Sequence, residues 1–386
     1  YRAGRLFTSG SGNTVIGDNA FYSAGARQYN TVLGSSAMYD ATTASKNVSI
    51  GYQSLANLTT GDSNVAIGYQ AGDALTTGFK NVAIGDSALS SDDVGAGHIA
   101  IGGNALVTQN FASVNNEFEA NISIGNKSSH NNTTGNMNVV IGTAAKYTDD
   151  EGNQTTAIGH QAMYSQNMAS STTTGNVGVG HKVGYYNVTG TGNTWLGYQA
   201  GAGASGQSNS SNVGIGYLAL SSVTTGGSNV AIGTNAGNSL TSGASNIMIG
   251  NGVATALTTG GSNVVIGTLA GIAVSEGEKN ILIGRDAGKD ISTGDSNIAI
   301  GYQALYVENT GTYAVAIGYR SGYKNRLSGQ NENVFVGSNA GRENVDGNDN
   351  VYVGFGAGYG VSSGGAYSNV AIGNYALYNA RNNENV

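Results

Sequence analysis

The sequence contains no cysteine, no proline and few charged residues. Lys, Arg, Asp and Glu make up 10% of the 386 residues, and the formal net charge is −7. Without cysteine, no disulfide framework can hold the chain together. A mild and dispersed negative charge argues against nucleic acid as a partner. No apolar run approaches the roughly 18 residues that span a membrane, so we expect no membrane insertion of this segment.

Motifs that carry chemistry are also missing. The four histidines, His98, His130, His160 and His181, lie far apart in the sequence and do not have the spacing of metal ligands. The sequence has no nucleophile elbow, phosphate-binding loop or paired carboxylates. We therefore predict that the chain is not an enzyme and that it holds no metal and no cofactor.

What the sequence does contain is a repeat rich in glycine, a residue that occurs 63 times. The pentad Asn-Val-Ala-Ile-Gly stands at 64–68 and returns at 81–85, 229–233 and 369–373. The glycine that closes each copy, here called the anchor glycine, recurs 21 times from Gly17 to Gly373, and fifteen of the twenty intervals are 17 residues. A short period of this kind outweighs the domain count that the length suggests. It predicts one continuous repeat region over residues 1–386, which we expect to be a section of a longer chain.

The composition of the repeat predicts its local structure. A Val, Ile or Thr precedes each anchor glycine by three residues, and an Ile, Leu or Val precedes it by one. β-Branched residues at alternating positions are typical of a strand, and we expect these two side chains to face the core. After the glycine we expect a second short strand with a small inward residue, such as Ala71, and then a polar turn such as Thr-Thr-Gly at 59–61. Each repeat is then one circuit, or coil, of an all-β parallel β-solenoid of about 21 coils.

The middle residue of the pentad should point away from the two flanking side chains. If Val65 and Ile67 face the core, Ala66 faces outward, and this position is non-polar or aromatic in 19 of the 21 copies. A strand that is apolar on both faces is typically buried on both. The pattern therefore predicts self-association through the middle residues. The candidates for this interface are Ala66, Ala83, Ala100, Val140, Ala231, Met248, Val265, Leu282 and Ala299.

Three further positions invite a structural or a binding interpretation. The first pentad residue is Asn in 18 of the 21 copies, which predicts a corner column with a ladder of stacked amides. Tyrosines that follow an anchor glycine, such as Tyr52 and Tyr69, form either a strip that binds sugars or an amphipathic column that covers the coil edge. The long intervals between Gly102 and Gly125 and between Gly159 and Gly180 are either tolerated loops or receptor contacts. The candidates for receptor contact are Phe111, Phe118 and Tyr164.

The pentad followed by Ala after two further residues resembles the repeat in the YadA-type heads of trimeric autotransporter adhesins. The longer form, Asn-Val-Ala-Ile-Gly-Tyr-Gln-Ala-Gly at 64–72 with Thr-Thr-Gly at 76–78, looks more like the repeats of bacteriophage tail-fibre proteins. The resemblance covers essentially the whole chain. It implies a left-handed solenoid and a parallel homotrimer.

From this resemblance we expect the shaft of an extracellular trimeric fibre, in the first place a phage tail fibre on the virion that supports host attachment. The alternative is a bacterial surface adhesin or extracellular filament of the trimeric autotransporter type. A third hypothesis, a glycan-active enzyme mounted on a solenoid, lacks candidate carboxylates in the sequence. The expected partners are two further copies of the chain and a host cell-surface glycan or protein.

Overall fold

A computed structural model describes residues 3–4, 7–23, 25–110, 119–168, 170–307, 310–326, 328–360 and 367–378. Two of the predicted receptor-contact residues, Phe111 and Phe118, lie outside these ranges. The structure divides into two compact units, residues 1–193 and 194–386. A single solenoid over residues 1–386 therefore stays a prediction.

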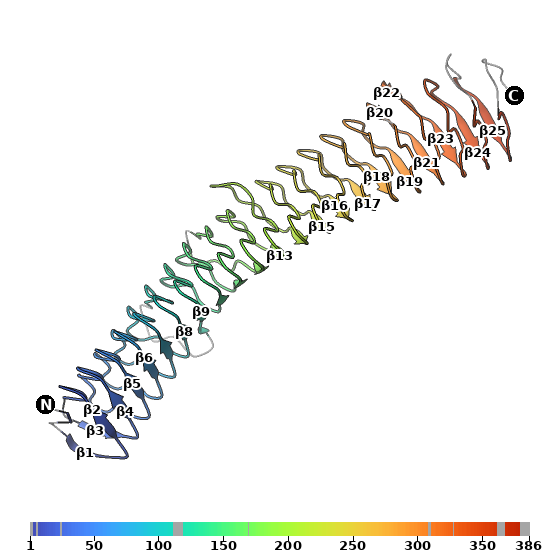
Figure 1. The fold of residues 1–386 in the computed structure, drawn as a ribbon. Helices are drawn as coiled ribbons and strands as arrows, with labels where there is room; N and C mark the ends of the chain where they lie inside the picture. Colours follow the sequence, from blue (N-terminus) through green and yellow to red (C-terminus); the bar gives the residue numbers. More distant parts are fainter. Residues whose placement is uncertain are drawn as a thin grey trace. The chain divides into compact units, whose positions relative to one another are not determined.

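The described part of the first unit contains twelve strands. All but β1 and β3, which pair with each other, join one parallel sheet in which the order of the strands follows the chain (Figure 1). The strands are β1 (Phe7–Ser11), β2 (Thr14–Ile16), β3 (Gly25–Gln28), β4 (Thr31–Leu33), β5 (Val48–Ile50), β6 (Val65–Ile67), β7 (Val82–Ile84), β8 (Ile99–Ile101), β9 (Ile122–Ile124), β10 (Val139–Ile141), β11 (Thr156–Ile158) and β12 (Val177–Val179).

The second unit repeats this arrangement, with β20 and β22 as a separate parallel pair. Its strands are β13 (Thr194–Leu196), β14 (Val213–Ile215), β15 (Val230–Ile232), β16 (Ile247–Ile249), β17 (Val264–Ile266), β18 (Ile281–Ile283), β19 (Ile298–Ile300), β20 (Thr310–Thr312), β21 (Val315–Ile317), β22 (Ser328–Gln330), β23 (Val334–Val336), β24 (Val351–Val353) and β25 (Val370–Ile372).

The register within each sheet follows the sequence repeat. Each residue pairs with its equivalent in the next copy, so that Val65 lies beside Val82 and Ile247 beside Val264. No α-helix occurs in the described ranges. The chain is thus an all-β parallel β-solenoid of about 20 coils with a repeat of about 17 residues, as the sequence predicted.

The segment after each anchor glycine differs from the prediction, because it is a chain of turns and not a second strand. Its second and fourth residues adopt left-handed backbone angles, with φ of 51° at Gln70 and 47° at Leu55. The backbone amides of this segment bond to both neighbouring coils: Gln70 N donates to Tyr52 O at 2.9 Å and Leu55 N to Ala71 O at 3.0 Å. The predicted small inward residue is confirmed, since Ala71 is fully buried.

Two features require glycine at the anchor position: its backbone angle φ and the closeness of the backbone in the next coil. Gly233 has φ of 135°, and a Cβ placed on it would lie 2.2 Å from the carbonyl oxygen of Gly250 in the next coil. No side chain fits at that distance from a backbone atom, and this explains why the position is glycine in every copy.

A pair of glycine substitutions separates these two requirements. Gly233→Ala is expected to lower the free energy of unfolding by at least about 3 kcal/mol, because it meets both the backbone clash and the unfavourable φ. Gly206→Ala is the control, since Gly206 has φ of 75° but no atom within 4 Å of the added Cβ. It should cost only about 1 kcal/mol. Equal losses in chemical denaturation would contradict the steric explanation.

Candidate functional site

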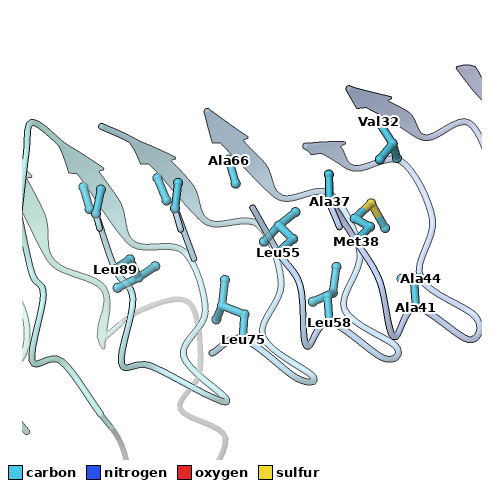
Figure 2. Packing of buried hydrophobic residues seen from close by; sticks show 14 of the residues in the cluster. Val32, Ala37, Met38, Ala41, Ala44, Leu55, Leu58, Ala66, Leu75 and Leu89 are labelled. Carbon is cyan, nitrogen blue, oxygen red and sulfur yellow. The ribbon is translucent and has the colours of Figure 1, made fainter. Parts of the chain in front are cut away.

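From β4 onward, the middle residue of each pentad strand lies in the core of its own coil. The nine residues predicted to face outward are at most 1% exposed: Ala66, Ala83, Ala100, Val140, Ala231, Met248, Val265, Leu282 and Ala299. In Figure 2, Ala66 projects from its strand toward the interior that also holds Leu55 and Leu58. The predicted orientation of these nine side chains is wrong, and the surface that the strands present is formed by their flanking residues.

The physical reason is the small volume that a coil of 17 residues encloses. One side chain per strand enters it, and the bulkiest of these side chains are followed by a glycine six positions later. Leu282 pairs in this way with Gly288, where an added Cβ would lie 2.6 Å from Leu282 Cδ2. The large middle residues Trp195, Phe335 and Tyr352 are likewise followed by Gly201, Gly341 and Gly358, whose added Cβ atoms would lie within 2.5 Å of the rings.

This compensation predicts a rescue between two positions. Leu282→Ala should lower the free energy of unfolding by about 2–5 kcal/mol, because it leaves a cavity. Adding Gly288→Leu should recover most of that loss, since Ala with Leu is the pair found in the next coil at Ala299 and Leu305, both buried. Gly288→Leu alone should destabilise the chain by overpacking. Additive losses in the double variant, measured by denaturant unfolding, would contradict the size match.

The outer face of the strands carries the branched residues three and one before the anchor glycine, here called the outer columns. Because the register is exact, they form two apolar rows along the sheet of each unit. Most members are half-buried, as Val65 and Ile67 are. The most exposed, at 36–71%, are Ile16, Leu33, Ile141, Val177, Leu196, Ile247, Ile317, Val370 and Ile372. Contiguous exposed apolar patches larger than roughly a few hundred Å² are rare on soluble monomers and typically mark an interaction site.

The asparagine four residues before the anchor glycine forms the predicted ladder. In the second unit, Asn246 donates its backbone N–H to Asn229 Oδ1 at 2.9 Å and its side-chain amide to the same oxygen at 3.1 Å. That amide also donates to Gly260 O at 3.0 Å, which ties the strand to the turn on the opposite side of the coil. The ladder is buried, and its role in the described residues is structural.

The ladder is interrupted twice in the first unit, and both breaks are repaired in the same way. His98 and Thr155 stand where an asparagine is expected. The next ladder residues, Asn121 and Asn176, then donate their side-chain amides to Gln109 Oε1 at 3.0 Å and Gln166 Oε1 at 3.1 Å. The two long intervals in the sequence contain these two glutamines.

The glutamines belong to a core column seven residues after the anchor glycine. It is apolar in most coils, for example at Leu58, Leu75, Val223, Leu240, Leu257, Val274 and Ile291. Over six consecutive coils it becomes polar and stays buried, at Asp92, Gln109, Asn132, Asp149, Gln166 and Asn187. Sequence reasoning missed this column, although an alignment of the copies by the anchor glycine would have revealed it.

His98 is held in its neutral form inside the core. Its Nδ1 accepts the backbone N–H of Asn121 at 3.0 Å, so the ring proton resides on Nε2. Burial lowers the pKa of His98 to about 4. The carboxylate of Asp92, 3.5 Å from Nε2, would favour a charged ring, but it does not outweigh the loss of solvation and the occupied Nδ1.

This histidine should make the chain less stable in acid. Between pH 6.5 and about 4, the unfolded state binds a proton that the folded state does not. The free energy of unfolding therefore decreases as the pH is lowered through this range. The loss is complete near pH 4 and amounts to roughly 3 kcal/mol. His98→Asn restores the ladder residue of the other coils and should remove this part of the decline. Denaturation at pH 7 and pH 4.5 checks it; an unchanged decline in His98→Asn would contradict the assignment.

The exposed tyrosines after the anchor glycines stack on one another. The rings of Tyr52 and Tyr69 are 5.4 Å apart with an interplanar angle of 15°, and Tyr302 and Tyr319 are 5.5 Å apart at 10°. Parallel stacking turns each ring face toward its neighbour, and the rings present mainly edges and hydroxyl groups to solvent. This geometry favours the amphipathic column over a strip of open aromatic faces for sugars.

The remaining receptor-contact candidate, Tyr164, lies in a longer stack of the same kind. Its ring is 5.2 Å from those of both Tyr147 and Tyr185, and His130 continues the stack beyond Tyr147 at 4.8 Å. Both faces of Tyr164 are therefore covered, and its contact with a receptor stays a prediction that would have to use the ring edge and hydroxyl.

Across the described ranges, no group of three or more His, Asp or Glu side chains is placed to hold a metal ion. The described part of the chain also contains no helix with the length and apolarity required to cross a membrane.

The fold and the outer columns define the chain as a β-solenoid repeat protein with an extended apolar face. Comparisons with family models, with curated proteins and with solved structures each find no match.

Proposed function

We propose that this chain forms the shaft of an extracellular fibre, in which three parallel copies pack through their outer columns and support host attachment by a phage particle. The observation that carries the proposal is the pair of apolar rows on the strands. They run along the sheet of each unit and are built from side chains such as Val65, Ile67 and Ile247.

The rows support a partner, because side chains that are apolar and partly exposed along a whole sheet are stabilised when another surface covers them. A second copy of the chain supplies the same rows at the same axial spacing, so its branched side chains can interlock over the whole sheet. A partner of another kind need not have a repeat of 17 residues that matches these rows. The number of copies and the fibre role rest on the resemblance to tail-fibre repeats, which is strongest in the longer motif at 64–72.

The corrected orientation changes the residues that test the assembly. Substituting Ala66 would disturb the core of its own coil, whereas the outer columns can be changed at exposed positions. Ile247→Lys with Ile249→Lys places two charges on β16, where Ile247 is 39% exposed. We expect this double variant to dissociate from three copies to one, because a buried charge without a partner is costly.

The control is Ser242→Lys with Thr259→Lys, two exposed turn positions in the same unit. It adds the same charge away from the strands and should remain an assembly of three. Solution mass by light scattering measures the outcome. A wild-type chain that is monomeric, or a strand variant that assembles as well as its control, would overturn the interface; a mass of two copies would overturn the trimer.

A further inference from the structure

Lys146 lies in the core of the first unit with a fully buried side chain. It occupies the position four residues after Gly142, where most other coils place Leu, Met or Gly. Its side-chain nitrogen Nζ is 3.0 Å from Asp149 Oδ2 and 3.1 Å from Asn132 Oδ1. A potential nucleophile, a carboxamide and a carboxyl group thus meet in a site closed to bulk water.

The carboxamide of Asn132 is held with its oxygen toward the lysine. Its Nδ2 donates to Gly135 O at 2.8 Å and to Gln109 Oε1. With both acceptors on the nitrogen side, only the oxygen can face Nζ, which fixes the amide orientation. Asn132 and Lys146 belong to neighbouring coils, 14 residues apart.

The carboxyl group of Asp149 is positioned just as firmly. Its Oδ2 accepts from Gln166 Nε2 at 2.6 Å, and its Oδ1 accepts the backbone N–H groups of Gly152 and Met168, each at 3.1 Å. Burial raises the pKa of Asp149, but Lys146, Gln166 and the Met168 N–H together outweigh burial and lower the pKa overall. The resting pair is therefore an ion pair.

Burial lowers the pKa of Lys146 by more than Asp149 and Asp150 raise it. A proton can pass from Nζ to Asp149 Oδ2 along their 3.0 Å contact, which leaves a neutral amine and a neutral acid without moving net charge through the core. The neutral amine is the nucleophilic form of lysine.

We propose that Lys146 and Asn132 react to form an intramolecular amide bond between their side chains, with Asp149 as the acid and base. Nζ attacks Cγ of Asn132, and the Asp149 acid first donates a hydrogen bond to the carboxamide. As the Cγ–Nδ2 bond breaks, Asp149 delivers its proton to the departing nitrogen, which leaves as ammonia, and the resulting carboxylate takes the proton that Nζ releases. The N–Cγ bond to Lys146 replaces the Cγ–Nδ2 bond, and Asp149 ends as the neutral acid. No oxidant or further reactant is needed.

Asn132 is favoured over Asp149 as the group that is attacked. As a carboxylate with three hydrogen-bond donors besides Lys146, Asp149 is a poor electrophile, and a bond to it would release water. A bond to Asn132 joins two adjacent coils between the two ladder breaks. It would therefore prevent those coils from separating in a chain that has no cysteine with which to crosslink them.

The experiment uses the full 386-residue chain, denatured and weighed intact. The expected mass is lower than that of the sequence by one molecule of ammonia. Trypsin digestion then locates the change. The side-chain nitrogen of a reacted Lys146 carries no charge, so trypsin does not cleave the peptide bond that follows this residue. Residues 128–182, between Lys127 and Lys182, should remain one uncut peptide that lacks one ammonia.

Two variants serve as controls. Asn132→Leu, the residue found at this position in coils with Leu58 and Leu75, should give the full mass and normal cleavage after Lys146. Asp149→Asn, which removes the acid, should also leave Lys146 free to be cut. The proposal is overturned if the wild type has its full mass, if it lost water instead of ammonia, or if Lys146 is cut in the wild type. The wild-type result alone decides this, even where a variant does not fold.

Discussion

The separation of neighbouring coils by about 4.8 Å is the constraint on which the rest of the structure depends. At that spacing the anchor glycines stack backbone against backbone, and a Cβ on Gly233 would lie 2.2 Å from the next coil. The same spacing brings each ladder asparagine within hydrogen-bond reach of its equivalent, as at Asn229 and Asn246. The repeat length varies by even numbers of residues at the long intervals, while the strands keep one register.

The features that follow from local chemistry could be predicted from the sequence. The period, the parallel strands, the anchor glycine and the asparagine ladder each depend on one residue type at one position. The inward or outward choice could not be predicted from alternation alone, since Val65, Ala66 and Ile67 are all apolar and a period of two does not say which face is inside. The pairing of large middle residues with glycine, as at Leu282 and Gly288, carried that information and required a comparison between positions.

The segment after the anchor glycine was mispredicted for another reason. Leu and Gln seldom adopt left-handed backbone angles, so Leu55 and Gln70 gave no sign of the turns that they form. Their conformation is imposed by hydrogen bonds to both adjacent coils, which is a property of the stack and not of the segment. The polar core column arises in a similar way, because Gln109 and Gln166 compensate for ladder residues that lie elsewhere in the chain.

Left-handed residues such as Leu55 and Gln70 also make an isolated coil costly to form. Each such residue costs about 1 kcal/mol or more, and the cost is offset only when a neighbouring coil accepts and donates the hydrogen bonds of that segment. The first coil to form has no neighbouring coil with which to make these hydrogen bonds. Formation of a solenoid therefore begins with a slow nucleus of several coils. Growth then proceeds by adding coils to an existing face, and a coil at the end of a stack, with one neighbour, opens before a coil in the interior.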